Sequence, residues 1–289
     1  MSLLFGHIRG LFVLLLVICL IVLIVVPVPV KYLARRLARV TVYIPTEEAK
    51  VETGVNYTLY RETDAPKRSS VIAIVVGGAF MFSDLDTHYG LANEIWRECR
   101  ERHDVLVVSY PVRFGNTLHD AMLSLNDTFQ RVVRDDYAKR HLVGVSSGAL
   151  LAGTFLRKEK DATYSRLIDV PRIGLSFDSF VGLNGVYDTT FDSGLVSTLF
   201  RFYVLRGTKH GEQYSAYGVG AKTLVIASTN DFLYAQQTER YLRTNECDKL
   251  LFGNQTNLPH NFMQMMQYPE SDTVVKKISE FVDEPRLAL

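Results

Sequence analysis

The sequence predicts an α/β fold in which a mostly parallel sheet is covered by helices on both faces. Beyond an apolar N-terminal segment, short apolar runs alternate with stretches of helical spacing, the pattern of such a fold. The run Val71–Val76 is apolar throughout and ends in Gly77-Gly78. A continuous β-branched run bounded by glycines is typical of a strand that is buried on both faces. The 289 residues suffice for one large domain of this class.

The other elements follow the same alternation of apolar runs and helical spacing. Strands are expected at Val40–Ile44, Tyr57–Tyr60, Val71–Val76, Asp104–Ser109, His141–Val145, Phe180–Leu183, Thr223–Ser228 and Leu250–Phe252. Helices are expected at Tyr89–Arg102, from Thr117 to about Lys139, at Ser147–Lys158 and at Ser271–Val282. The helix from Ser147 begins with small residues, which let its backbone approach the sheet.

Residues 1–30 are interpreted as a membrane anchor. The segment Leu11–Val26, extended to Val30, carries no charge and provides roughly the 20 apolar residues that a spanning helix needs. A cleaved signal peptide is the alternative, but the run exceeds a usual signal core and no clear cleavage site follows it. A basic juxtamembrane segment, 31–54, connects the anchor to the domain at 55–289.

The side of the membrane on which the domain lies stays open. Lys31, Arg35, Arg36 and Arg39 follow the anchor, and by the positive-inside rule they favour a cytoplasmic domain. Three glycosylation sequons, at Asn56, Asn126 and Asn254, favour a lumenal one. We expect a single-pass membrane protein of the endoplasmic reticulum or another endomembrane.

Composition excludes several classes of function. The 32 Lys and Arg nearly balance the 31 Asp and Glu, so there is no basic excess for binding nucleic acid. No phosphate-binding loop or dinucleotide fingerprint occurs, so no cofactor is expected. Of three cysteines, Cys19 lies in the anchor, which leaves Cys99 and Cys247 as the only candidate pair; no spacing resembles a metal site. Nothing in the sequence indicates the oligomeric state.

The motif with the clearest chemistry is Gly144-Val145-Ser146-Ser147-Gly148, which matches G-x-S-x-G. In this motif the serine lies on a sharp turn between a strand and a helix, and the flanking glycines prevent clashes with neighbouring strands. The pattern alone is weak, and either serine could be an ordinary turn residue. Here an apolar strand precedes it and a small-residue helix follows, which is the expected context. Ser146 is therefore the candidate nucleophile.

Small residues also follow the strand at Val71–Val76, in the sequence Gly77-Gly78-Ala79-Phe80. They leave backbone N–H groups accessible, and acyl transfer needs such donors for the oxyanion of its tetrahedral intermediate. A simple glycine turn is the alternative interpretation.

A serine nucleophile requires an acid and a histidine, in the order Ser, Asp, His for this strand–turn–helix type. Asp231 follows the strand at Thr223–Ser228, and His260 lies in a loop before the last helix. Asp188 is a rival acid because it also follows a strand. The other histidines break the order or lie at the base of a strand: His88, His103, His119, His141 and His210.

Together these motifs resemble those of the α/β-hydrolase fold, specifically the hormone-sensitive-lipase-like branch that includes arylacetamide deacetylase. That branch has His-Gly-Gly-Gly where this chain has Val76-Gly77-Gly78-Ala79, and Gly-Asp-Ser-Ala-Gly-Gly where it has residues 144–149. Its Asp-x-Leu and His-Gly-Phe motifs resemble 231–233 and 260–262. The resemblance covers roughly residues 55–289 and implies oxyanion donors at the amides of Gly78, Ala79 and Ser147. Val76 and Val145 depart from the branch's pattern.

The expected function is that of a membrane-anchored serine esterase or lipase acting on lipophilic esters through Ser146, His260 and Asp231. A cap insertion at about 189–219, apolar at Leu195–Leu205, would cover the site or serve as a helix that simply packs on the sheet. Two alternatives stay open: a catalytically silent binding protein of the same fold, and an acyltransferase that passes the acyl group to a lipid alcohol.

Overall fold

The computed structural model describes residues 49–63, 68–80, 84–111, 116–133, 137–191, 204–208, 210–253 and 257–284. The predicted anchor at 1–30 and the strand expected at Val40–Ile44 lie outside these ranges. Within the described ranges, no helix combines the length and the apolar character that crossing a membrane requires.

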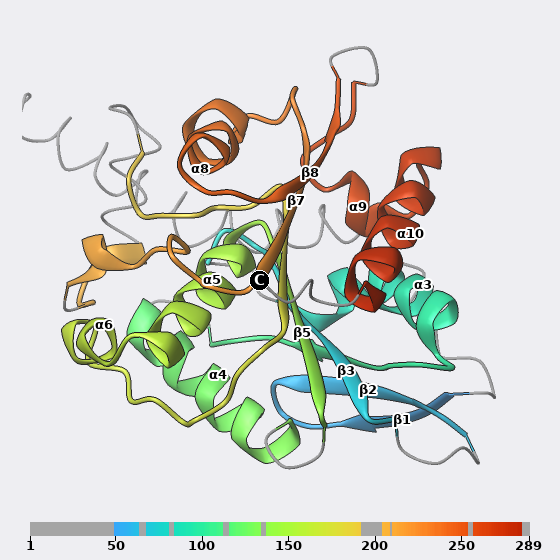
Figure 1. Cartoon of the computed structure of the whole chain (residues 1–289), viewed down its shortest axis with the longest axis horizontal. Coiled ribbons are helices and arrows are strands. Elements are labelled where there is room, and N and C mark those ends of the chain that lie inside the picture. Colours follow the sequence, from blue (N-terminus) through green and yellow to red (C-terminus); the bar gives the residue numbers. More distant parts are fainter. Residues whose placement is uncertain are drawn as a thin grey trace, which may run out of the picture. The chain divides into compact units, whose positions relative to one another are not determined.

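The described strands form an eight-stranded sheet at the centre of the domain, in the order β1-β2-β4-β3-β5-β6-β7-β8 (Figure 1). Its strands are β1 (Ala49–Thr53), β2 (Tyr57–Glu62), β3 (Ser70–Val75), β4 (Asp104–Val108), β5 (Lys139–Val145), β6 (Ser179–Leu183), β7 (Lys222–Ser228) and β8 (Asp248–Phe252). β1 and β2 run antiparallel to their neighbours, and every other pair is parallel. The predicted, mostly parallel sheet is therefore confirmed.

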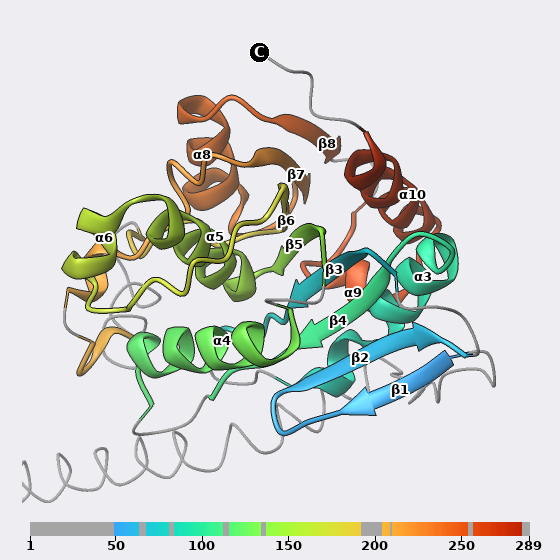
Figure 2. The ribbon, with the colours of Figure 1, turned by 60° about the horizontal axis from the view of Figure 1, so that its bottom comes forward.

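The helices cover both faces of this sheet, as Figure 2 shows: α3 and α10 pack against each other on one face, with α4 and α5 on the other. The helical elements are η1 (Leu85–His88), α3 (Tyr89–Cys99), α4 (Leu118–Val132), α5 (Ser147–Lys160), α6 (Ala162–Leu167), η3 (Gly211–Gln213), η4 (Tyr234–Thr238), α8 (Glu239–Thr244), α9 (Phe262–Met265) and α10 (Pro269–Asp283). Strands buried between two helical layers explain why β3 and β4 are apolar at nearly every position.

The expected elements that fall within the described ranges occur with shifted ends. The helix expected to reach about Lys139 ends at Val132, and β5 already begins at Lys139. β1 was not expected: it lies in the segment 31–54 assigned to the juxtamembrane region, yet it pairs with β2. Four of its five side chains are exposed, so it lacks the apolar face on which strand prediction depends.

The register of the parallel strands determines where functional side chains gather. Val75 of β3 pairs with Gly144 of β5, and Val145 pairs with Leu183 of β6. The turns that follow these strands therefore emerge at one edge of the sheet, which is where open α/β sheets bind ligands.

Two of the three sequons have their side-chain nitrogens engaged inside the domain. Asn126 is 5% exposed and donates a hydrogen bond to the carbonyl of Pro171 at 2.9 Å. Asn56 is half-buried and donates to Ser124 Oγ at 3.1 Å. A glycan on Asn126 would have to break its hydrogen bond to Pro171 and expose the side chain. Cys99 and Cys247 are free thiols.

Acid is expected to destabilise the domain through His141, which is 3% exposed at the amino end of β5. Burial lowers its pKa from 6.5 to about 4, and the neighbouring His103, whose ring lies 5.4 Å away, adds to the shift. Because burial disfavours protonation of His141 in the native state, this residue does not lower the free energy of unfolding above pH 6.5. It destabilises the fold progressively as the pH falls from 6.5 to about 4, by at most about 3 kcal/mol.

Urea unfolding of wild type and His141→Gln between pH 7.5 and 4.5 measures this effect, with a His119→Asn variant, at a half-buried histidine, as control. We expect His141→Gln to lose less stability on acidification than either of the other two. Parallel curves for all three proteins would show that His141 does not carry the acid response.

Candidate active site

Ser146 lies on the turn between β5 and α5 and has a strained backbone, with φ 51° and ψ −120°. A non-glycine residue in such a conformation costs about 1–3 kcal/mol and persists only where its surroundings hold it. Here the Ser146 N–H donates to the carbonyl of Leu183 at 2.9 Å, and the Ser146 carbonyl accepts from the N–H of Val186 at 3.0 Å. The loop after β6 thus holds the turn from the side.

The turn also requires close contact between β3 and α5. A Cβ on Gly148 would lie 2.2 Å from the carbonyl oxygen of Val75, so only glycine permits the first turn of this helix to lie against the sheet. This is the physical basis of the second glycine in the G-x-S-x-G motif.

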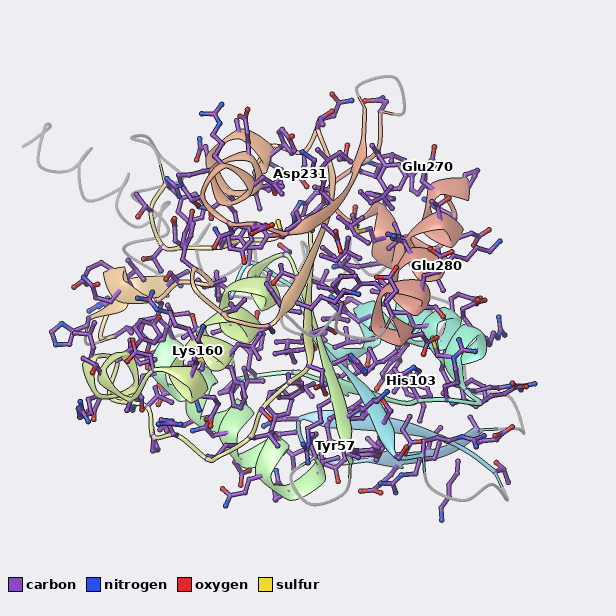
Figure 3. The ribbon with its side chains drawn as sticks, in the orientation of Figure 1. Tyr57, His103, Lys160, Asp231, Glu270 and Glu280 are labelled. Atoms are coloured by element: carbon purple, nitrogen blue, oxygen red, sulfur yellow. The ribbon has the colours of Figure 1, made fainter. Side chains whose placement is uncertain are left out.

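The structure brings the three residues of the predicted triad into one hydrogen-bonded chain. His260 Nε2 lies 2.8 Å from Ser146 Oγ, and His260 Nδ1 is hydrogen-bonded to Asp231 Oδ2. Asp231 is 7% exposed and follows β7 (labelled in Figure 3), and its other oxygen accepts the N–H of Leu233 at 2.7 Å. The carboxylate thereby keeps a fixed orientation and leaves one oxygen for the imidazole.

A residue that the sequence did not single out, Asn184, holds the loop of His260. Its side-chain nitrogen donates to the carbonyl of His260 at 2.7 Å, and its side-chain oxygen accepts the N–H of Ser228 at 3.0 Å. Asn184 is 2% exposed and has a φ of 41°, a conformation that asparagine tolerates better than most residues. The Asn-Gly pair directly after β6 was the available signal.

Asp188, the alternative candidate for the acid of the triad, has other partners. Asp188 forms an ion pair with Arg240 at 2.6 Å and accepts the N–H of Thr190 at 2.7 Å.

The rejected histidines lie in other surroundings. His103 and His141 lie edge to face at the amino ends of the strands, His119 contacts the carbonyl of Asp169, and His210 is exposed. His88 is different, because it is buried beneath the turn that follows β3.

That turn has an unusual backbone. Gly78, Ala79 and Phe80 all have positive φ, at 124°, 53° and 59°. None of the hydrogen bonds among the described residues uses the amides of Gly78, Ala79 or Ser147 as donors. Ser147 lies at the first position of α5, whose N-terminus favours negative charge. The side-chain hydroxyl of Ser147 lies 3.0 Å from the hydroxyl of Tyr110 and does not occupy the backbone amide of Ser147.

Only part of the predicted cap at 189–219 lies in the described ranges, and Leu195–Tyr203 lies outside them. The described part is attached to the domain through a bridge between Asp188 and Ser215 and through the buried ring of Tyr214. Beside the triad, Phe232 is 69% exposed and its ring centroid lies 5.0 Å from that of His260. The site thus presents one apolar ring to solvent.

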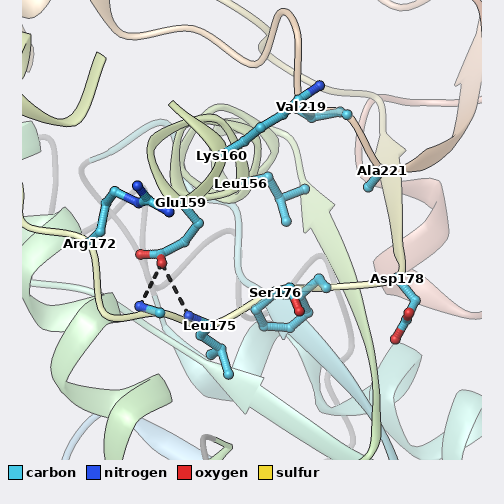
Figure 4. A pocket seen from close by; sticks show the side chains of 12 residues that line it. Leu156, Glu159, Lys160, Arg172, Leu175, Ser176, Asp178, Val219 and Ala221 are labelled. Atoms are coloured by element: carbon cyan, nitrogen blue, oxygen red, sulfur yellow. Dashed lines mark hydrogen bonds between the residues drawn. The ribbon is translucent and has the colours of Figure 1, made fainter. Parts of the chain in front are cut away.

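A cavity of about 420 Å³ lies away from this site (Figure 4). It is lined by residues that precede β6 and β7, including Asp178 and Ala221, and by the end of α5. In its wall, Glu159 accepts the N–H groups of Gly174 and Leu175. Among the described residues, no group of three or more His, Cys, Asp or Glu side chains is arranged to hold a metal ion.

Neither a family model nor a curated protein matches this chain. Solved structures do. Esterase B from Lactobacillus rhamnosis, in an inhibited form, superimposes with a TM-score of 0.75 at 16% identity, over 88% of this chain and 93% of its own. A hyperthermophilic esterase from the archaeon Pyrobaculum calidifontis gives 0.68 at 15% identity, over 89% and 92%. An esterase/lipase from an uncultured bacterium gives 0.60 at 14% identity, over 89% and 97%.

These proteins share the overall fold of this chain at sequence identities of only 14–16%. Similarity of this extent at such low identity establishes the fold and leaves the activity to be argued from the site. The chain has the α/β-hydrolase fold.

Proposed function

We propose that this protein is a serine hydrolase that cleaves carboxylic esters through an acyl-enzyme. The observation that carries the proposal is the hydrogen-bonded chain from Ser146 Oγ through His260 to Asp231, which starts on a strained strand-to-helix turn. A strained nucleophile turn, a base within hydrogen-bond reach and an acid that orients the base are the parts that nucleophilic catalysis requires.

In the first step, Ser146 Oγ attacks the ester carbonyl while His260 Nε2 takes the hydroxyl proton. The new C–O bond converts the carbonyl oxygen into an oxyanion, which the amides of Gly78, Ala79 and Ser147 are assigned to stabilise. His260 then gives its proton to the leaving alcohol as the ester C–O bond breaks, and the acyl group remains on Ser146.

In the second step, water attacks the acyl-enzyme and gives its proton to His260, which returns it to Ser146 as the carboxylic acid leaves. Asp231 accepts the Nδ1 proton of His260 throughout, which keeps Nε2 free to accept a proton and stabilises the charged imidazole. In the overall reaction, one ester and one water molecule yield one carboxylic acid and one alcohol.

We further propose that the enzyme belongs to the hormone-sensitive-lipase-like branch and acts on uncharged, lipophilic esters. Support comes from the residues that resemble the branch's motifs and from the exposed Phe232 beside His260. Esterase B from Lactobacillus rhamnosis, which shares the fold at 17% identity, has been crystallised with a tributyrin phosphonate inhibitor. Short triglycerides are therefore sensible first substrates to test.

The membrane anchor at 1–30 and an endomembrane location remain proposals that rest on the N-terminal sequence alone. They agree with a lipophilic substrate because an anchored domain meets its substrate at the bilayer.

The test is covalent labelling of the full chain, purified in detergent, with a fluorophosphonate probe, combined with hydrolysis of p-nitrophenyl butyrate and tributyrin. We expect a single adduct, mapped by mass spectrometry to Ser146, and turnover of both esters. Ser176→Ala serves as the matched control, since Ser176 is an exposed serine at the far cavity.

A folded wild-type protein that neither takes the label nor hydrolyses either ester would refute the proposal and favour the binding-protein alternative. Faster transfer of the acyl group to an added lipid alcohol than to water would favour the acyltransferase.

A further inference from the structure

The imidazole of His88 fills the space beneath the turn at Gly77–Phe80. His88 ends the short helix η1 and is 1% exposed. Its Nε2 lies 2.9 Å from the backbone nitrogen of Gly77 and 3.1 Å from the side-chain nitrogen of Gln264. A buried imidazole thus touches the root of the turn that supplies two of the assigned oxyanion donors.

These contacts determine the tautomer of the ring. A backbone N–H can only donate, so Nε2 must accept from Gly77 and carries no proton. The proton of the neutral ring therefore resides on Nδ1, which lies 2.9 Å from Thr87 Oγ1. The Thr87 hydroxyl in turn donates to the carbonyl of Asp84 at 2.8 Å. The Nδ1–H therefore has an acceptor in Thr87, and the single lone pair of Nε2 is shared by the Gly77 N–H and the Gln264 amide.

The same nitrogen connects two parts of the candidate site. Gly77 leads into the turn, while Gln264 lies in α9, four residues after His260. His88 is thereby in contact with the segment that carries the oxyanion donors and with the segment that carries the general base.

The turn needs such support because its backbone is strained. Ala79 and Phe80 have φ values of 53° and 59°, and each non-glycine residue in this region costs about 1–2 kcal/mol. Without an external anchor, the turn would relax toward negative φ and its amides would rotate. The hydrogen bond from Gly77 to His88 is an anchor of this kind.

The turn also lies directly against the nucleophile. A Cβ on Gly77 would be 2.8 Å from the carbonyl oxygen of Val145 and 3.1 Å from Ser146 Cβ. A small displacement of Gly77 would therefore change both the direction of the donors and the space at Ser146.

We propose that His88 is a positioning residue of this active site: as a neutral acceptor for the Gly77 amide, it holds the turn at 77–80 with its following amides directed at the oxyanion. The proposal rests on the hydrolase activity proposed above. His88 does not touch the substrate, and it acts through the backbone of the turn.

Burial keeps the ring in the accepting state. It lowers the pKa of His88 from 6.5 to about 4, so the imidazole stays neutral near pH 7. A protonated ring would lose the acceptor at Nε2 and with it the bond to Gly77.

The kinetic test compares His88→Phe, His88→Gln and Gln264→Leu with wild type. Phenylalanine fills similar space but accepts no hydrogen bond, and we expect kcat to fall by about 10²-fold with KM little changed, since loss or misplacement of an oxyanion donor costs this much. The affinity for an alkyl boronic acid, which mimics the tetrahedral intermediate, should fall by a similar factor. His88→Gln, whose side-chain oxygen can accept from Gly77, should recover part of the loss.

Gln264→Leu removes the second donor to Nε2 and leaves the Gly77 bond, so its effect on kcat should be smaller than that of His88→Phe. His119→Phe, at a half-buried histidine outside the site, is the matched control. Equal kcat and boronate affinity in folded His88→Phe and wild type would overturn the proposal. It would also be overturned if His88→Phe lowered the melting temperature and nothing else.

A second measurement does not depend on catalysis or on the folding of any variant. ¹⁵N NMR of histidine-labelled wild type should show His88 as the neutral tautomer protonated on Nδ1, unchanged from pH 8 to 5.5. An Nε2-protonated ring, or titration near pH 6.5, would overturn the proposal. An inactive wild-type protein would refute the proposed function, whereas an active one with unaffected His88→Phe kinetics would refute only the role of His88.

Discussion

Replacement of Ser146 by alanine or glycine is expected to lower kcat for ester hydrolysis by ~10⁴- to 10⁶-fold, because the proposed acyl-enzyme forms on Ser146 Oγ. The two variants should differ in stability. Ser146 has a φ of 51° and a ψ of −120°, a conformation that glycine adopts without strain and alanine does not. We therefore expect Ser146→Gly to be more stable than Ser146→Ala by about 1 kcal/mol, even after the greater entropy of glycine in the unfolded chain is taken into account.

The measurements are kcat with p-nitrophenyl butyrate and urea unfolding of both variants. Circular dichroism spectra that match wild type ensure that lost activity reflects lost chemistry. Substantial turnover by folded Ser146→Ala would show that Ser146 is not the nucleophile. A less stable Ser146→Gly would show that the turn is not strained in solution.

Asp231→Asn is expected to lower kcat by about 10⁴-fold, the loss seen when the acid of a well-studied serine protease triad is changed in this way. The carboxylate accepts the Nδ1 proton of His260. An asparagine nitrogen placed there would donate to Nδ1 instead and favour the tautomer with its proton on Nε2. That tautomer cannot accept the proton of Ser146, so the base would be present but unable to act.

Asp188→Asn is the matched control, because Asp188 also follows a strand but pairs with Arg240 rather than with a histidine. It should retain kcat near the wild-type value and lose only some stability. A large loss of kcat in Asp188→Asn together with a small one in Asp231→Asn would reverse the assignment of the acid.

Local patterns in the sequence are sufficient for the central strands and for the nucleophile turn. β3 and β4 are apolar at every position after the first, because burial on both faces favours apolar side chains. The nucleophile motif Gly144–Gly148 can be recognised in the sequence because the sharp turn has no room for a side chain at Gly148. Asp231 and His260 could also be selected from the sequence, because they follow Ser146 in the order that this type of triad requires. In contrast, the exposed strand β1 has no apolar periodicity and becomes a strand only by pairing with β2.

The contacts that define the site arise only in the tertiary structure. Ser146 and His260 are 114 positions apart, and Asn184 and His260 are 76 apart. His88, set aside from the sequence because it precedes Ser146, gains its environment from Gly77 and Gln264. The sequence by itself determined the sheet, the strained turn and the order of the candidate triad, since apolar periodicity and the need for glycine are local. Strand order and loop packing decided which acid meets His260 and what supports the oxyanion turn, because such contacts depend on where distant segments meet.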